Sequence, residues 1–346
     1  MTIQASHFKP DSKPDHWYIL GAGALGCLWA SELIKRAVPV TVLVRPERLA
    51  EQRYDPLLTV DSADRRAIFP VTLASVQHEQ TSTDDKSATP IKQLLVTTKA
   101  SDTLTALQQL GDRLTPDTLI VLLQNGLGHQ QQVAEAFPDC AIFAGSTTDG
   151  AWQQTFLHIH RAGSGLTRFG ALNERANRPE YRQRLQTLLH LDTLQAEESP
   201  DILPVLQQKV AINSAINGLT VLYNCANGEL LKPELQQHVA RLCAETEAIL
   251  ASEGFPNPNG DCQHQPWLLE QVNQVLAATG SNISSSLQDV RNGRPTELGY
   301  INGYLLDCAA RHHIPAPAHQ QLMLALQSVQ PLHAQPVKTD LADVIV

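Results

Sequence analysis

Trp17-Tyr18-Ile19-Leu20-Gly21-Ala22-Gly23-Ala24-Leu25-Gly26 is a short apolar run followed by three spaced glycines. The apolar part, residues 17–20, predicts a buried strand that stops at the first glycine. Residues 27–34 then have the spacing of a helix, and residues 40–45 form a second apolar run that predicts a strand. A strand, a glycine turn, a helix and a strand within about 30 residues make a βαβ unit.

Each glycine of the turn has a separate use in a βαβ unit that binds a dinucleotide. Gly21 allows the tight turn, Gly23 lets backbone N–H groups approach a pyrophosphate, and Gly26 lets helix and strand pack closely. The helix directs its positive N-terminal end at the phosphates. We therefore expect a dinucleotide site, the alternative being a tight turn without a ligand. The predicted cofactor contacts in this turn are Gly21, Ala22, Gly23, Ala24, Leu25 and Gly26.

The end of the second strand indicates which dinucleotide is bound. An NAD site places an acidic residue about 20 residues after the glycines, where it bonds the ribose hydroxyls. Here Arg45 occupies that place, and its planar guanidinium suits a 2′-phosphate. The sequence thus favours NADPH. Glu47 keeps NAD open, and Arg45 could also be an ordinary solvated charge at a strand end.

Bulk composition limits the class of protein. A chain of 346 residues with 42% hydrophobic and 18% charged residues is expected to form two globular domains. The net charge of −9 argues against a nucleic-acid partner. Six scattered cysteines without a C-x-x-C pair are typical of a reduced, cytoplasmic protein without a metal. No apolar run reaches the roughly 18 residues that span a membrane, and the polar residues 1–15 predict a disordered leader.

The rest of the N-terminal half continues the α/β pattern. Lys99 and Asn125 each directly follow a buried strand, and ligands of open α/β sheets bind beyond such carboxyl ends. Alternatively, they are a solvated lysine and a turn-forming Asn-Gly pair. His158 and His160 share a strand face but have no further ligand at metal-site spacing, so a metal is not expected. The predicted strands cover residues 57–60, 67–73, 94–98, 119–123 and 140–144, with helices at 102–110 and 175–189 and a closing hairpin at 155–169.

The C-terminal half is predicted to be helical. Residues 195–204, with two prolines, three acids and little apolar content, are the expected domain boundary. The predicted domains are a Rossmann-type NADP-binding domain at 16–198 and an all-α substrate domain at 199–330, followed by a loose tail at 331–346. The predicted helices cover residues 202–222, 233–254, 267–279, 297–312 and 317–327.

One helix of the second half carries an unusual polar stripe. Lys209, Asn213 and Asn217 are spaced i, i+4, i+8 and therefore lie on one face of an otherwise apolar helix. Buried polar groups need partners. We expect a polar ligand in a cleft between the domains, the alternative being a hydrogen-bond network with a snorkelling lysine. A desolvated lysine releases its proton more readily, so Lys209 is the candidate acid for the reduction of a ketone.

Two further polar positions lie near helix starts. Ser285 with Gln288 fits a capping box, and Ser285 could also bind a substrate carboxylate. Glu297 lies at the start of the next predicted helix, where the helix dipole is already a sufficient reason for an acid. A functional role for either residue gains support only in combination with Lys209.

These motifs together resemble the ketopantoate reductase (2-dehydropantoate 2-reductase) family. The resemblance extends in order over about residues 17–325. It rests on the segments Gly21–Gly26, Leu94–Ala100, Asn125–Gly128, Lys209–Thr220, Asn224–Leu230, Asn282–Ser285 and Thr296–Glu297, and on Tyr300–Gly303. The helical-domain segments are more specific than the glycine turn.

The resemblance implies an NADPH-dependent reduction of 2-dehydropantoate to (R)-pantoate in pantothenate and coenzyme A biosynthesis, by a monomer or homodimer. It makes Lys209 the general acid, with Glu297 at the reacting end near cofactor and substrate. It also implies two sets of contacts. The cofactor set adds Arg45, Lys99, Asn125 and the backbone of Ala151; the set for the small-molecule 2-oxo acid is Asn125, Lys209, Asn213, Asn217, Asn227 and Ser285. Reduction of a different 2-oxo acid, and NADP(H) sensing without catalysis, stay open as alternatives.

Overall fold

The computed structural model describes residues 16–51, 54–77, 89–256 and 266–328. These residues form two compact units. The first contains the described residues up to Thr98 together with Thr105–Leu123 and Ala134–Pro200. The second contains Lys99–Leu104, Gln124–Val133 and the described residues from Asp201 onward. The predicted leader, residues 1–15, and the predicted tail, residues 331–346, lie outside the described residues.

The first unit is built on an eight-stranded sheet with the order β12-β11-β8-β7-β6-β1-β2-β5. Six of its strands, β5-β2-β1-β6-β7-β8, have the order typical of a Rossmann fold. The strand order changes direction at β1, which has β2 on one side and β6 on the other. All pairs are parallel except β8 with β11. The strands are β1 (Trp17–Leu20), β2 (Val40–Val44), β5 (Thr72–Ser75), β6 (Ile91–Val96), β7 (Leu114–Leu122), β8 (Ala141–Thr147), β11 (Leu166–Ala171) and β12 (Gln195–Glu198).

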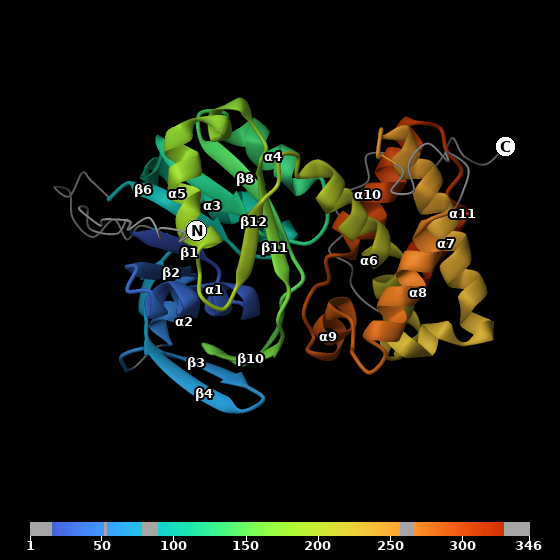
Figure 1. Cartoon of the computed structure of the whole chain (residues 1–346), viewed down its shortest axis with the longest axis horizontal. Helices are drawn as coiled ribbons and strands as arrows, with labels where there is room; N and C mark the ends of the chain where they lie inside the picture. Colours follow the sequence, from blue (N-terminus) through green and yellow to red (C-terminus); the bar gives the residue numbers. More distant parts are fainter. Residues whose placement is uncertain (1–15, 52–53, 78–88, 257–265, 329–346) are drawn as a thin grey trace, which may run out of the picture. The chain divides into compact units, whose positions relative to one another are not determined.

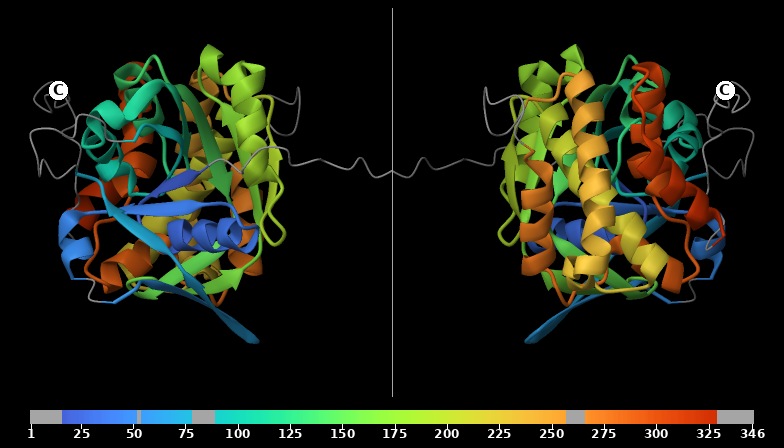
Figure 2. Two further views of the ribbon diagram at one scale, coloured as in Figure 1. Left: turned by 90° about the vertical axis from the view of Figure 1, so that its left-hand side faces the viewer. Right: turned by 90° about the vertical axis from the view of Figure 1, so that its right-hand side faces the viewer.

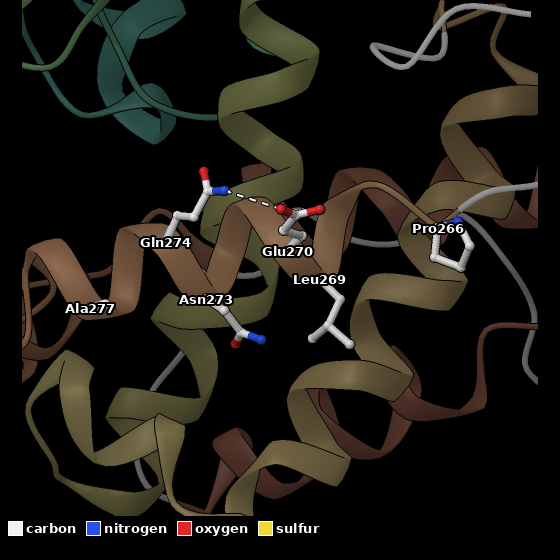
Figure 3. Close-up of a pocket in the computed structure, with 6 residues that line it drawn as sticks. All are labelled: Pro266, Leu269, Glu270, Asn273, Gln274 and Ala277. Carbon is white, nitrogen blue, oxygen red and sulfur yellow. Dashed lines mark hydrogen bonds between the residues drawn. The ribbon is translucent and has the colours of Figure 1, made fainter. Parts of the chain in front are cut away.

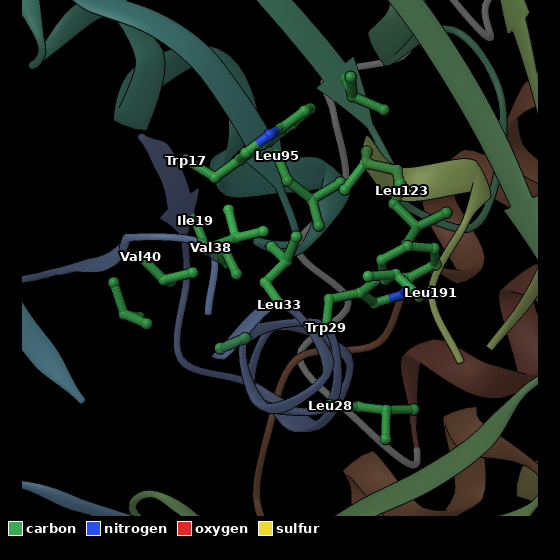
Figure 4. Close-up of a cluster of buried hydrophobic side chains, with 14 of the residues drawn as sticks. Trp17, Ile19, Leu28, Trp29, Leu33, Val38, Val40, Leu95, Leu123 and Leu191 are labelled. Carbon is green, nitrogen blue, oxygen red and sulfur yellow. The ribbon is translucent and has the colours of Figure 1, made fainter. Parts of the chain in front are cut away.

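Both faces of this sheet are covered, which explains why its central strands are apolar runs instead of alternating sequences. Ile19, next to the fully buried Leu20, lies in a buried cluster with Trp29 of α1 (Ala24–Lys35) and Leu185 of α5 (Pro179–Leu189). Figure 4 shows part of this cluster around α1. The ring of Trp29 on α1 packs edge-on against that of Phe169 on β11, with 5.5 Å between the ring centroids. The helix is therefore packed directly against the sheet. The other helical segments that precede Pro200 in the sequence are α2 (Pro46–Ala50), α3 (Ala100–Gln108), η1 (Gly111–Arg113), α4 (His129–Ala136) and η2 (Glu174–Asn177).

A smaller sheet lies on the far side of α1. It has four strands in the order β4-β3-β10-β9. Helix α1 contacts β1 and β2 of the large sheet and also β3, β9 and β10, so it is packed between the two sheets (Figure 1). The strands are β3 (Leu57–Ser62), β4 (Arg65–Pro70), β9 (Gly150–Thr155) and β10 (His158–Gly163).

Two local predictions for the first unit are wrong. Residues 155–169 do not form a hairpin, because β10 pairs with β3 and β9 whereas β11 leaves to pair with β8 in the other sheet. The predicted strand at 67–73 is two strands, β4 beside β3 and β5 beside β2. In both cases the apolar run was correctly recognised, but the local sequence does not determine its partner strand. The expected boundary segment, residues 195–204, begins with the edge strand β12 (Gln195–Glu198), and the two units divide at Pro200–Asp201.

The second unit is helical, as predicted. Helix α6 contacts each of the other five α-helices described from Asp201 onward (Figure 1). These helices are coloured yellow to red in Figures 1 and 2. The elements are α6 (Leu203–Tyr223), η3 (Asn227–Leu231), α7 (Pro233–Ser252), α8 (Leu268–Ala278), α9 (Ser285–Arg291), α10 (Leu298–Arg311) and α11 (Pro317–Gln327). The Rossmann-type α/β part followed by an all-α part confirms the predicted fold class.

A buried polar network joins α6 to its neighbours. Ser214 and Thr246 share a hydrogen bond of 3.1 Å, and Thr246 also bonds His319 Nε2 at 2.9 Å. Asn302 donates to the carbonyl of Ser214 at 2.8 Å. Burial lowers the pKa of His319 to about 4, so the network holds a neutral imidazole. These hydrogen bonds fix α6 on the side of Ser214.

Candidate active site

Backbone conformation or close packing requires glycine at two positions of the turn after β1. Gly21 has φ +106°, a conformation that glycine adopts without strain. A Cβ on Gly26 would lie 2.1 Å from the carbonyl oxygen of Gly21 and 2.5 Å from Thr97 Oγ1. The hydroxyl of Thr97 donates to that same carbonyl at 3.0 Å. The turn is therefore a close-packed crossing of β1, α1 and the end of β6.

Gly23 is different, because neither its conformation nor its packing against the described residues requires a glycine. Its φ of −75° and ψ of −176° suit any residue. The nearest atom to a Cβ built there, the carbonyl oxygen of Thr97, is 4.0 Å away. A glycine that neither conformation nor packing explains, at the N-terminus of a helix, fits the close approach of a pyrophosphate. The residues of this turn therefore fit a dinucleotide.

Arg45 and Ala151 also lie in the first unit. Arg45 is exposed at the end of β2, and its carbonyl accepts the N–H groups of Arg48 and Leu49 at the start of α2. Its guanidinium is therefore accessible to a phosphate. Glu47, the alternative ribose partner, is likewise exposed in the first turn of α2. Ala151 lies on β9 and packs against the core cluster, as Ala22 of the glycine turn also does.

The predicted stripe on α6 lies in the second unit. Asn217 is 5% exposed and Lys209 and Asn213 are partly buried, while Val210, Ala211 and Ser214 on the same helix are fully covered. Within the described residues, the side chains of Asn213 and Asn217 make no hydrogen bond with protein groups. The buried network of α6 is on the side of Ser214, so Asn213 and Asn217 have unused hydrogen-bonding capacity among the described residues.

Glu297 is held by two residues from distant parts of the sequence. Its Oε2 accepts from Asn125 Nδ2 at 3.1 Å, and its Oε1 accepts from the N–H of Ala100 at 3.2 Å. The Asn125 turn is itself attached to α10, since Leu127 N–H donates to the carbonyl of Tyr300 at 2.8 Å. Gly126, with φ +88°, fits there because a Cβ would lie 2.5 Å from that carbonyl. Asn125 and Glu297 are thus brought together by a built contact.

The electrostatics of Lys209 and Glu297 are coupled. Burial lowers the pKa of Lys209 to about 8, and the negative charge of Glu297 opposes that shift. Burial raises the pKa of Glu297, opposed by the charge of Lys99 and by its two hydrogen bonds. A lysine with a pKa near 8 can hold a proton at neutral pH and release it readily, as a general acid must.

Lys99 forms an ion pair with Asp289, a residue that the sequence analysis did not single out. Burial raises the pKa of Asp289 and the charge of Lys99 opposes the rise. Asp289 and Ser285 lie one turn apart on α9, so the pair fixes the helix that carries Ser285. The four-residue spacing of Ser285 and Asp289 indicates that they share a helix face. The sequence does not indicate that Lys99 is the partner of Asp289, because the two residues are 190 positions apart.

Ser285 and Asn227 differ in accessibility. The capping box predicted for Ser285 is wrong, because Ser284 is the N-cap of α9 and accepts from Leu287 N–H at 3.1 Å. Ser285 itself is exposed in the first turn. Asn227 is buried and donates to Thr279 Oγ1 at 2.9 Å, while its Oδ1 has no partner among the described residues.

Other candidate sites are less informative. No group of three or more possible metal ligands occurs in the described ranges, and His158 bonds Asp61 at 2.9 Å while His160 stacks near Trp152. A hollow of about 570 Å³ runs along α8 and is lined by Leu269 and five neighbouring residues (Figure 3). A second hollow, of about 200 Å³, lies among α6, α7 and α11. Neither hollow contains a predicted site residue.

Comparison with known proteins identifies the family. The model of the ketopantoate reductase PanE/ApbA family matches residues 17–174, and the model of its C-terminal domain matches residues 201–330. The 2-dehydropantoate 2-reductase of Yersinia pestis is 33% identical over 305 residues, which cover 88% of this chain and 91% of that protein. This chain belongs to the ketopantoate reductase family.

Solved structures share the fold. A probable 2-dehydropantoate 2-reductase from Bacillus subtilis is 24% identical, with a TM-score of 0.72 over 91% of this chain and 100% of that one. A D-mandelate dehydrogenase, solved with NADH and anilino(oxo)acetate, is 19% identical with a TM-score of 0.76 over 91% of this chain and 98% of that one. Among the helices of the described residues, none combines the length and apolarity that crossing a membrane requires.

Proposed function

We propose that this chain is an NADPH-dependent 2-dehydropantoate 2-reductase that produces (R)-pantoate for pantothenate and coenzyme A biosynthesis. Membership of the family, with relatives named for this activity over most of their length, supports the reaction. The single structural observation that carries the proposal is the hydrogen bond between Glu297 and Asn125, since the charge of the same carboxylate opposes the lowering of the Lys209 pKa by burial. In that arrangement Lys209 is the proton donor, and the negative charge of Glu297 favours its protonated form.

The first unit would hold the phosphates of the cofactor. The N–H groups of the Gly21–Gly26 turn and the start of α1 would bind the pyrophosphate, and Arg45 the 2′-phosphate that distinguishes NADPH. Lys99, Asn125 and the backbone of Ala151 complete the proposed contacts, together with Glu297. When bound, NADPH supplies the hydride that reduces the C2 ketone.

The chain's own residues would manage the developing charge on the substrate. Protonated Lys209 donates its proton to the ketone oxygen as that oxygen becomes an alkoxide. The carboxylate of Glu297 keeps the lysine charged until then, because it raises the pKa that burial lowers. Asn213 and Asn217 present unused amide groups beside Lys209 and would orient the 2-oxo acid. Ser285 and Asn227 would contact the remainder of the substrate, with Ser285 on the carboxylate.

Domain roles and cellular location follow as part of the same proposal. Residues 16–198 would form the cofactor domain and residues 199–330 the substrate domain. The five cysteines of the described residues are unpaired, which supports action in the reducing cytoplasm. The active form would be a monomer or a homodimer.

Substrate profiling tests the proposal. Purified protein is mixed with NADPH and a panel of 2-oxo acids, including 2-dehydropantoate, pyruvate and phenylglyoxylate, and NADPH absorbance is followed. We expect the highest kcat/KM with 2-dehydropantoate. A higher value with another acid would show a reductase of different specificity. Tight NADPH binding without turnover of any acid would indicate a cofactor sensor.

A further inference from the structure

The glycine turn has a hydrogen-bond partner from the small sheet. The side-chain amide of Gln153 donates to the carbonyl oxygen of Ala22 at 2.8 Å. Gln153 lies on β9, 131 residues further along the chain. Ala22 stands between the first two glycines of the turn, so this bond acts directly on the segment predicted to meet the pyrophosphate.

The geometry of β9 directs Gln153 inward. Ala151 and Gln153 are partly buried, whereas Trp152 and Gln154 are exposed, as expected for alternating faces of a strand. Gln153 pairs in register with Ile159 of β10, which is fully buried in the core cluster around α1. The strand pair is therefore anchored on α1, and Gln153 reaches the turn from a fixed position.

A bond to the Ala22 carbonyl also sets the direction of the next N–H group. In a trans peptide the C=O and the following N–H lie in one plane and point in opposite directions. Holding the Ala22 oxygen toward β9 thus aims the Gly23 N–H away from β9. Gly23 is the residue whose glycine identity no contact inside the protein explains.

This peptide needs such a restraint because its second residue, Gly23, is a glycine. Glycine adopts positive and negative φ about equally well, so the Ala22–Gly23 plane can rotate at little cost. The other contact to the Ala22 carbonyl is the thiol of Cys27 at 3.5 Å, and a thiol is a weak donor. Gln153 is the strong donor to this carbonyl in the described structure.

We infer that Gln153 is a positioning residue for the dinucleotide, which locks the Ala22–Gly23 peptide so that the Gly23 N–H is presented to the pyrophosphate. The inference rests on the proposed function, since it concerns the same cofactor site. It assigns part of the small sheet a role in cofactor binding. The pyrophosphate is common to NADPH and NADH, so the effect must be the same for both.

The test uses two substitutions and a matched control in the full-length protein. Gln153→Met keeps the shape and removes the donor; Gln153→Glu replaces the donor by an acceptor facing a carbonyl. Gln154→Met is the control, because it makes the same chemical change on the exposed face of the strand. The dissociation constants of NADPH and NADH, the kcat at saturating NADPH, the thermal midpoint and the Gly23 amide signal in ¹⁵N NMR are measured.

We expect Gln153→Met to weaken both dinucleotides by the same factor, about three- to tenfold, which corresponds to one neutral hydrogen bond. Gln153→Glu should weaken both further. Saturating kcat and the thermal midpoint should be unchanged, the Gly23 signal should broaden, and Gln154→Met should behave like the native protein. Native-like affinity of Gln153→Met, or a loss of NADPH binding alone, would overturn the inference. Failure of the native protein to bind any dinucleotide would instead overturn the proposed function.

Discussion

The carboxylate of Glu297 accepts a hydrogen bond of 3.1 Å from the side-chain amide of Asn125. The negative charge of Glu297 also opposes the lowering of the Lys209 pKa by burial. This carboxylate therefore connects the Asn125 turn to the candidate acid. This relationship joins two segments that are 172 residues apart. It is the basis for treating the three residues as one catalytic group.

The pH dependence of reduction should report Lys209 and its coupling to Glu297. The acid must be protonated, and its pKa is lowered to about 8, so kcat/KM should be constant at lower pH and fall above about pH 8. Glu297→Gln removes the charge that raises this pKa, so the decline should begin at a lower pH. Glu270→Gln, on α8, is the control and should leave the profile unchanged. A profile that Glu297→Gln does not shift would contradict the coupling.

Gly23→Ala and Gly26→Ala should fail in different ways. A Cβ at Gly23 meets no protein atom closer than 4.0 Å, so Gly23→Ala should fold normally and bind NADPH at least about tenfold more weakly. A Cβ at Gly26 would lie 2.1 Å from a backbone oxygen, so Gly26→Ala should lower stability by about 1–3 kcal/mol. Thermal unfolding and NADPH titration of both variants separate the two effects. Equal loss of stability would refute the distinction.

Arg45 should determine the choice between the two dinucleotides. Arg45→Ala removes a guanidinium that is exposed at the end of β2, so kcat/KM with NADPH should fall about 10- to 100-fold, as for a lost charge-assisted hydrogen bond. The value with NADH should change little. Arg36→Ala, which removes another surface arginine of the first unit, serves as control. An equal fall with both cofactors would argue against recognition of the 2′-phosphate.

Two asparagines of the second unit offer a matched comparison of function and stability. Asn217 has no side-chain partner in the described structure, so Asn217→Ala should keep the native thermal midpoint and raise the KM for the 2-oxo acid about tenfold. Asn302 is fully buried and donates to the carbonyl of Ser214 at 2.8 Å. Asn302→Ala should therefore lower stability by about 1–3 kcal/mol. If Asn217→Ala destabilised the protein instead, its side chain would have a structural role.

Local patterns were sufficient for most of the fold. The segments around Ile19 and Val42, with a glycine turn between them, encode strand, turn and helix within a few residues, and the structure confirms that unit. The helix with Lys209 was likewise readable from its spacing. The error at residues 155–169 has a different origin, since β10 and β11 each pair with strands that are distant in sequence.

The site was predictable only where its residues stand in recognisable motifs. Lys209, Asn125 and Glu297 belong to such segments, and the structure brings Asn125 and Glu297 into contact. Asp289 and Gln153 were not predicted, because an ordinary acid on a helix and a glutamine on a short strand acquire meaning only from partners elsewhere. Those partners, Lys99 and the Ala22 carbonyl, are fixed by tertiary packing.

The most direct measurement is the rate of 2-dehydropantoate reduction by NADPH in the native protein and in Lys209→Ala at neutral pH, with NADPH affinity measured in parallel. The native protein should turn over the substrate. The variant should retain its thermal midpoint and NADPH affinity but lose roughly 100-fold or more in kcat, the loss expected for a general acid. An unchanged kcat in Lys209→Ala, or a native protein that does not reduce 2-dehydropantoate, would contradict the account.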